Sequence, residues 1–211
     1  MEGHNLMSSG LGQEILDLTF EHLFLVSLSM GIAAAVAVPA GILLTRRVFL
    51  QRWVLGFANV MQTVPSLALF GFLIPLPLLG GIGTHTAIVA LALYALLPIL
   101  RNTLTGILNV DPAVRESAIA MGMTGRQLLW EVELPLATRT ILAGLRIATV
   151  TTIGTATIAA AIGGGGLGVF IFRGLASVDT TLLLAGAIPA ALIAMAADRG
   201  LEWVEEKLSP V

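Results

Sequence analysis

The chain has 211 residues, of which 56% are hydrophobic and only 11% charged, and its formal net charge is −2 at pH 7. Its mean hydropathy of +0.94 indicates more apolar surface than a water-soluble domain can bury. We therefore expect an integral membrane protein of one domain, without the charge to attract nucleic acid. The absence of cysteine excludes disulfides and thiolate metal sites or nucleophiles.

The N-terminal stretch is polar and acidic and contains no Lys or Arg. Leu11, Ile15 and Leu18 are spaced for a short helix that lies on the membrane surface. No basic region precedes the first apolar run, so a cleavable signal peptide is not expected. The expected organisation is a segment at the outer membrane face over 1–19, a transmembrane domain over 20–200 and a cytoplasmic tail over 201–211.

Five apolar segments are long enough to cross a bilayer as helices. Their approximate bounds are 20–45, 54–79, 85–108, 138–162 and 180–197. Proline recurs in most of them, and each proline frees a carbonyl that a neighbouring group or a water-filled cavity must satisfy. The prolines favour broken helices beside a pathway, but proline is also generally more frequent in membrane helices than in soluble ones. Both explanations stay open.

A polar cluster lies inside the apolar stretch of the second span. Its members are Asn59, Gln62, Thr63, Pro65 and Ser66. The cluster is equally compatible with a pathway lining near a dimer axis and with hydrogen bonds between helices. Asn59, Gln62, Pro65 and Ser66 are our candidate pathway residues.

The connection before the fifth span, residues 163–179, contains four glycines in succession. They are Gly163, Gly164, Gly165 and Gly166. Consecutive glycines allow backbone conformations that other residues rarely adopt. We interpret the run as a gate or hinge loop on the outer side; the alternative is a close-packed turn that requires small residues.

The basic residues set the predicted orientation. With the N-terminus outside and the C-terminus in the cytoplasm, all of the 11 Lys and Arg residues except Arg173 lie on the cytoplasmic side. Trp53, Trp130 and Trp203 fall near the same face, as interfacial anchors do.

No Asp, Glu, Lys or Arg lies in the middle of a predicted span. Proton- and ion-driven carriers need such groups, so the energy for transport is expected to enter from elsewhere. The sequence has no G-x4-G-K-[ST] phosphate loop, and His85 is expected at the interface rather than in a catalytic set. Neither a catalytic residue nor a metal site is predicted.

The longest polar interruption between spans is 116–135, with the sequence ESAIAMGMTGRQLLWEVELP. Asp111 is a good N-cap and Pro112 a good first helical residue, so a short helix is predicted after them. A glycine then ends that helix, Thr124 caps a second short helix, and Pro135 is expected to end it. Two short helices joined by glycines predict a knob at the membrane surface.

Within this knob, Glu116-Ser117-Ala118 is followed by three residues and Gly122, then by nine residues and Val132, and after one more by Leu134-Pro135. This spacing resembles the EAA loop of binding-protein-dependent ABC importer permeases, which has Ala and Ile in place of Ser117 and Val132. In that family the loop, here 111–137, is the coupling helix that docks in a groove of the ATPase subunit. The alternative is an ordinary amphipathic surface loop. The resemblance implies a coupling role for Glu116, Ser117, Ala118, Met121, Gly122, Met123, Thr124, Gly125, Leu134 and Pro135.

Four further stretches, 98–103, 109–112, 162–168 and 186–191, resemble the branch of that family that imports osmoprotectants such as glycine betaine, choline and carnitine. The resemblance covers about residues 20–200 and implies an all-α, polytopic type I importer permease with five transmembrane helices. It also implies a bacterial or archaeal cell membrane and a second permease subunit, identical or different. The expected partners are a pair of ATPase subunits that bind ATP and Mg²⁺ and an external binding protein, separate or fused to another subunit; no cofactor is expected in this chain.

The cargo rests on that resemblance alone. Proteins usually hold a quaternary ammonium in an aromatic cage, but the only tyrosine is Tyr94 and the tryptophans lie at the other face. Selection is therefore expected in the binding protein. The alternatives are an amino acid such as methionine as cargo, export instead of import, or a passive channel or scaffold.

Overall fold

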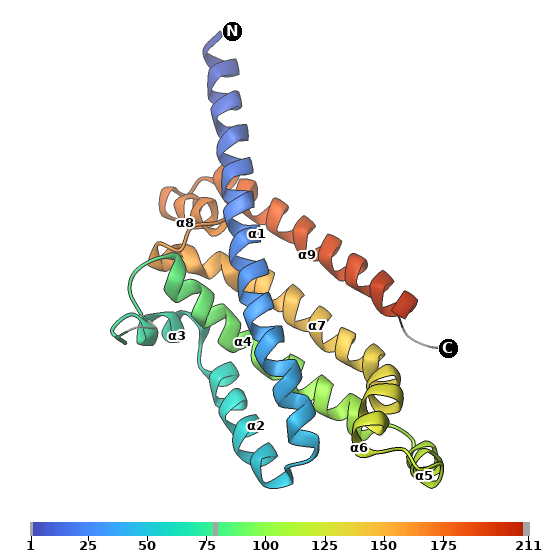
Figure 1. Ribbon diagram of the computed structural model, residues 1–211. Coiled ribbons are helices and arrows are strands. Elements are labelled where there is room, and N and C mark those ends of the chain that lie inside the picture. The colour runs from blue at the N-terminus through green and yellow to red at the C-terminus, as the bar shows by residue number, and fades with distance from the viewer. Residues whose placement is uncertain (1, 78–79, 209–211) are drawn as a thin grey trace.

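The structure is a computed structural model that describes residues 2–77 and 80–208, with side chains from residue 10 onward. Within these ranges every regular element is helical, which confirms the all-α prediction (Figure 1). The elements are α1 (Glu2–Thr45), α2 (Val48–Thr63), α3 (Ser66–Leu73), α4 (Thr84–Leu108), α5 (Pro112–Ala120), α6 (Gly125–Gln127), the π-helix η1 (Leu128–Glu133), α7 (Leu134–Ala156), the 3-10 helix η2 (Thr157–Ile162), α8 (Gly168–Ser177) and α9 (Thr180–Leu208).

Among the described residues, four helical stretches are long and apolar enough to cross a membrane: Gly10–Thr45, Thr84–Leu108, Gly125–Ile162 and Thr180–Leu208. The pair α2 and α3 passes the same test as a unit, but it is bent by 104°. Counted as one broken span, it completes the five spans that the sequence predicts for this part of the chain. The predicted end of the second span at residue 79, and residues 209–211 of the predicted tail, lie outside the described residues.

The bend between α2 and α3 follows from Pro65. A proline disfavours the helical conformation for the residue before it, and Val64 is extended, with φ −64° and ψ 129°. The carbonyl of Val64 accepts a hydrogen bond from the hydroxyl of Tyr94 on α4. A freed backbone group at membrane depth thus has a partner, as a bilayer requires.

The helix α4 lies at the centre of the bundle, with α1 and α7 packed against it and α9 against α7. Glycines allow the close approach. A Cβ at Gly41 of α1 would lie 2.7 Å from the Cβ of Thr103, and one at Gly144 of α7 would lie 2.5 Å from the Cβ of Asn102. Small residues at such contacts are typical of membrane helix packing.

The far end of α9 is joined to α7 by charged side chains. Arg146 Nε lies 3.3 Å from Asp198 Oδ1, and its Nη1 lies 3.4 Å from Glu202 Oε1 and 3.6 Å from Glu205 Oε2. Arg139 Nε lies 3.5 Å from Glu205 Oε1. These pairs hold the last part of α9 against α7.

Several boundaries differ from the sequence-based expectation. The N-terminal stretch is not a separate surface helix but the beginning of α1, because nothing between Leu11 and the span interrupts the helix. The connection after the glycines contains the short apolar helix α8. The fifth span continues without a break through Trp203 into the predicted tail, because no proline stands between them and the helix keeps Gly200 within it.

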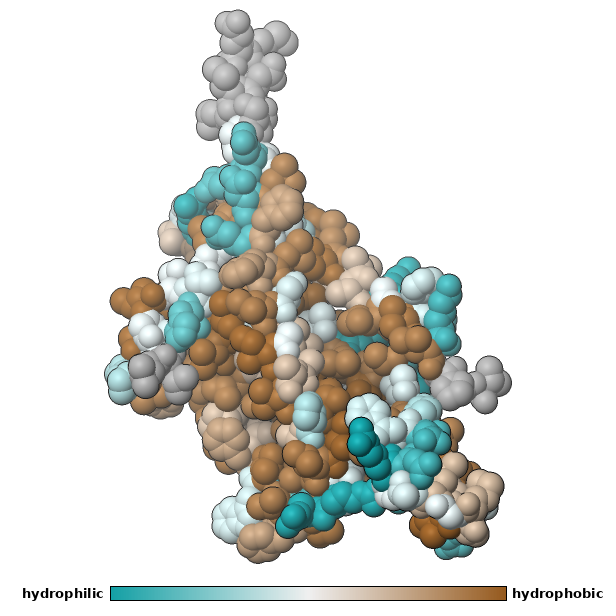
Figure 2. All heavy atoms as spheres, in the orientation of Figure 1, coloured by the Kyte–Doolittle hydropathy of each residue, from teal (hydrophilic) through white to brown (hydrophobic). Residues whose placement is uncertain are grey.

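Apolar side chains cover the middle of the molecule, and hydrophilic ones gather toward both ends, one of which carries α5, α6 and the loop between α1 and α2 (Figure 2). An exposed apolar surface of this extent is what lipid or a second membrane subunit covers.

Candidate functional site

The knob, which we define as residues 111–137, begins with the predicted capped helix. Asp111 Oδ1 accepts a hydrogen bond of 2.8 Å from the backbone N–H of Ala113, and Pro112 is the first residue of α5. The helix ends at Ala120, and Gly122 has a φ of +86°. Glycine adopts this left-handed conformation at little cost, so the predicted role of Gly122 as the helix stop is confirmed.

A capping box opens the second part of the knob. The N–H of Gln127 donates to Thr124 Oγ1 at 3.4 Å, and Gln127 Oε1 accepts from the N–H of Thr124 at 3.0 Å. The prediction that Pro135 ends this helix is wrong, since Pro135 lies in the first turn of α7. The chain widens into the π-helix η1 directly before it, at the place where the missing N–H and the ring disfavour a regular α-turn.

Most of the predicted coupling residues lie on the surface of the knob. Glu116, Ser117, Met121, Gly122, Thr124, Gly125 and Pro135 are exposed, Met123 and Leu134 are half-buried, and Ala118 is buried. Large apolar side chains lie among them: Ile119 is 58% exposed, Met121 73% and Trp130 61%. Apolar residues on an otherwise polar protrusion favour a protein docking surface. A shallow hollow beside them is lined by Thr124, Arg126, Gln127, Trp130 and Glu131.

An ionic cluster around the buried side chain of Glu133 links the knob to the end of α1. The side chain of Glu133, the last residue of η1, is only 3% exposed. Its Oε2 lies 3.2 Å from Nη2 of Arg46, and its Oε1 lies 3.1 Å from Nε of Arg115 on α5. Arg115 also donates from Nη2 to the carbonyl of Ile107 at 2.5 Å. This cluster joins α5 to α1, η1 and the end of α4.

At the opposite end of the bundle, the glycine loop (residues 163–168) needs its glycines for two reasons. Gly163, Gly165 and Gly166 have φ values of +74°, +79° and +78°. A Cβ at Gly164 would lie 3.0 Å from the Cβ of Ala87, and one at Gly168 would lie 1.8 Å from the carbonyl oxygen of Thr157. The loop is therefore a close-packed turn in this structure, and its role as a gate stays a prediction.

Two neighbouring side chains of α1 contact this end of the bundle, Glu21 at the glycine loop and His22 at α7. Glu21 Oε2 accepts a hydrogen bond of 3.0 Å from the N–H of Gly166. His22 is buried, and its Nε2 lies 3.1 Å from the carbonyl oxygen of Ile153 on α7. Glu21 also lines a cavity of about 270 Å³ together with Phe24, Leu25, Thr84 and residues 163–165.

The polar cluster of α2 and α3 is divided in the structure. Asn59 Oδ1 accepts a hydrogen bond of 2.7 Å from Nη2 of Arg101 on α4, which supports the helix-joining interpretation for this residue. Gln62 and Pro65 are exposed on the surface of the chain, while Ser66 is half-buried at the start of α3. A pathway lining by Gln62 and Pro65 stays a prediction.

No group of three or more His, Asp or Glu side chains within the described ranges could hold a metal ion. His85 is exposed at the beginning of α4, where the sequence places it at the interface.

Residues 37–210 match the protein family described as "Binding-protein-dependent transport system inner membrane component". The chain belongs to this family. It is therefore a multi-pass membrane permease and a transport subunit rather than an enzyme, and the family resemblance drawn from the knob is confirmed.

Relatives with known names match nearly the whole permease. The Carnitine transport permease protein OpuCD of Listeria monocytogenes is 45% identical over 201 residues, which are 95% of this chain and 89% of the relative. The Choline transport system permease protein OpuBD of Bacillus subtilis is 46% identical, with coverage of 95% and 86%. The Osmoprotectant import permease protein OsmW of Salmonella typhimurium is 45% identical, with coverage of 92% and 91%.

Solved structures of ABC transporters share the fold. A chain of the MetNI methionine ABC transporter in an inward-facing conformation superposes with a TM-score of 0.81 at 24% identity, covering 90% of this permease and 94% of that chain. A second crystal form gives a TM-score of 0.75 at 27% identity, with coverage of 94% and 97%. The arrangement of helices is therefore shared with these ABC transporter chains.

Sequence reasoning missed the cluster of Glu133, Arg46 and Arg115. Glu133 stands at a variable position of the loop pattern, between Val132 and Leu134, so the pattern gives no signal for it. Glu21 and His22 were also missed, because they stand at the polar edge of an apolar run. A charged residue beside a motif is a weak signal until the fold shows what it contacts.

Proposed function

We propose that this permease forms the membrane pathway of an ATP-driven importer of osmoprotectants such as glycine betaine, choline or carnitine. The supporting observation is the 45–46% identity to permeases named for carnitine and choline transport, over 95% of the chain. Identity at this level across the whole length, including the knob and the glycine loop, favours a shared cargo class more strongly than a shared fold alone.

The proposed partners follow from this role. The knob docks on an ATPase subunit, which binds ATP and Mg²⁺, so the permease itself contributes no cofactor. Its exposed apolar residues, led by Met121 and Trp130, would be covered by that subunit. A second permease subunit completes the pathway in the bilayer, and an extracytoplasmic binding protein delivers the cargo to the opposite end, where the glycine loop lies.

Within this scheme the residues that the sequence singled out have distinct roles. The coupling role is assigned to the exposed surface of α5 and the turn after it. The outer gate is assigned to the glycine loop, which Glu21 of α1 contacts at Gly166. Gln62 and Pro65, which are exposed beside the break between α2 and α3, are assigned to the pathway lining that a second permease completes.

Reconstitution tests the cargo. The permease is placed in proteoliposomes with the ATPase and binding protein that co-purify with it, and uptake of labelled glycine betaine, choline and carnitine is compared with that of methionine. Methionine is the informative competitor, because the MetNI transporter has a similar fold. We expect ATP-dependent uptake of at least one quaternary amine and none of methionine. Uptake of methionine alone, or flux without ATP, would contradict the proposal.

A further inference from the structure

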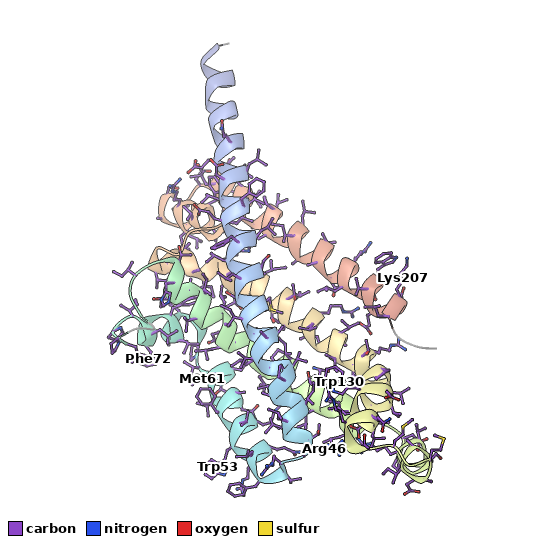
Figure 3. All side chains as sticks on the ribbon, viewed as in Figure 1. Arg46, Trp53, Met61, Phe72, Trp130 and Lys207 are labelled. Atoms are coloured by element: carbon purple, nitrogen blue, oxygen red, sulfur yellow. The ribbon has the colours of Figure 1, made fainter. Side chains whose placement is uncertain are left out.

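The ionic cluster of Arg46, Arg115 and Glu133 joins elements that are distant in the sequence. Arg46 directly follows α1, Arg115 lies on α5, and Glu133 ends η1, which leads into α7. Figure 3 shows Arg46 at the lower end of α1, on the side toward η1, which carries Trp130. Through one carboxylate, the helix expected to meet the ATPase is attached to two of the membrane-spanning helices.

Glu133 is the buried member of this attachment, while the Arg46 side chain is 52% exposed. A carboxylate that is 3% exposed is costly unless it is paired, and breaking a buried pair is costlier than removing both charges. Arg115 is itself 27% exposed, and its Nη2 is engaged with the carbonyl of Ile107. Its Nε faces Oε1 of Glu133 at ion-pair distance without the alignment of a hydrogen bond. Glu133 is therefore expected to stay with both guanidinium groups when α5 moves.

The opposite end of α1 contacts the glycine loop. Between Glu21 and Thr45 a helix rises by about 36 Å, at about 1.5 Å per residue. The helix continues through Pro39, and α4 supports it along this length. At the outer end, Glu21 accepts from Gly166 and His22 contacts Ile153. One continuous helix thus contacts the ionic cluster at one end and the glycine loop at the other.

We propose that Arg46, Glu133 and Arg115 form an ionic joint that passes the movement of α5 to α1, which carries it to the glycine loop. The inference rests on the proposed function, because it takes α5 to be the element that the ATPase moves. All three are positioning residues, since they act through the helices that they hold together.

The matched pair Arg46→Gln and Arg47→Gln tests the joint. Both substitutions remove one positive charge at the same turn, but Arg47 is exposed and makes no ion pair or side-chain hydrogen bond with any described residue. Each variant is reconstituted with the ATPase and the binding protein, and the ATP hydrolysed per cargo imported is measured. We expect Arg46→Gln to raise this ratio by about threefold or more and Arg47→Gln to keep the unsubstituted value. Equal ratios in the two variants would overturn the joint.

A distance measurement separates transmission from simple structural support. Because the chain contains no cysteine, spin labels can be placed at Leu43→Cys on α1 and Ala113→Cys on α5. With the joint intact, or with Arg47→Gln, the distance between the labels should be the same with and without ATP. With Arg46→Gln it should change on ATP binding. An unchanged distance in the Arg46→Gln complex would overturn transmission, even if the variant transports poorly.

The same assay shows which idea fails. If the unsubstituted complex hydrolyses no ATP and imports none of the quaternary amines, the proposed function fails. If it imports one of them and Arg46→Gln couples as well as Arg47→Gln does, only the joint fails.

Discussion

The residue with the most restrictive backbone in the knob is Gly122. Its φ of +86° ends α5 and redirects the chain toward Thr124. A Cβ at this position would meet no atom within 4 Å, so the constraint comes from the backbone and not from lack of space. Any side chain in a left-handed conformation costs about 1–2 kcal/mol, and the chain can avoid that cost by shifting α5.

We therefore expect Gly122→Ala to uncouple ATP hydrolysis from uptake while the permease still inserts in the membrane. The expected result is a loss of uptake of about tenfold, which corresponds to about 1.4 kcal/mol of coupling, with hydrolysis retained. The control is Gly200→Ala, which also has no atom within 4 Å of the added Cβ but lies inside α9. Coupled transport at the unsubstituted level in Gly122→Ala would contradict the docking role of α5.

The element that departs most from a simple spanning rod is the second span. Pro65 breaks it and leaves the carbonyl of Val64 for Tyr94 to satisfy. Tyr94 is the only tyrosine in the chain, too few for an aromatic cage, and no sequence pattern indicated that it would partner a helix break. Its structural role shows why the cargo class cannot be inferred from aromatic content.

Tyr94→Phe should therefore destabilise the permease by roughly 0.5–2 kcal/mol, because an unpaired carbonyl remains at membrane depth. The measurement is the apparent Tm in detergent. Thr63→Val is the control, since the Thr63 hydroxyl makes only a local hydrogen bond of 2.9 Å to the carbonyl of Val60. If Tyr94→Phe unfolds at the same temperature as the control, the Val64 carbonyl has another partner.

The elements themselves show what a sequence can predict. The N-caps Asp111 and Thr124, the helix stop at Gly122 and the third span were predictable, because each depends on residues within a few positions of one another. The 104° bend at Pro65 was predictable as a break but not as an angle, since its direction depends on packing against α4. The π-helix before Pro135 forms because the helix continues although Pro135 lacks an N–H and its ring disfavours a regular α-turn. No local sequence pattern predicts whether the helix ends or widens at such a proline.

At the scale of the whole molecule, the candidate site was predictable only where a motif carried it. The proposed coupling surface was predicted from the spacing of Glu116, Gly122 and Leu134. The ionic joint was not, because Arg46 and Glu133 are separated by 87 positions and meet only when α1 lies beside η1. The two ends of α1 acquire a common role only in the folded bundle.

The direction of transport depends on which end of the molecule faces the cytoplasm. Chemical labelling of exposed positions at the two ends measures this orientation. The two best positions lie at opposite ends: Val178, just after α8, is 91% exposed, and Met121 at the end of α5 is 73% exposed. Because the permease has no cysteine, Val178→Cys and Met121→Cys each give a single reactive thiol. An impermeant maleimide applied to intact cells should label the first but not the second, and both should be labelled after permeabilisation. Labelling of Met121→Cys in intact cells would place the knob outside, where no ATPase could reach it, and the importer mechanism would fail with it.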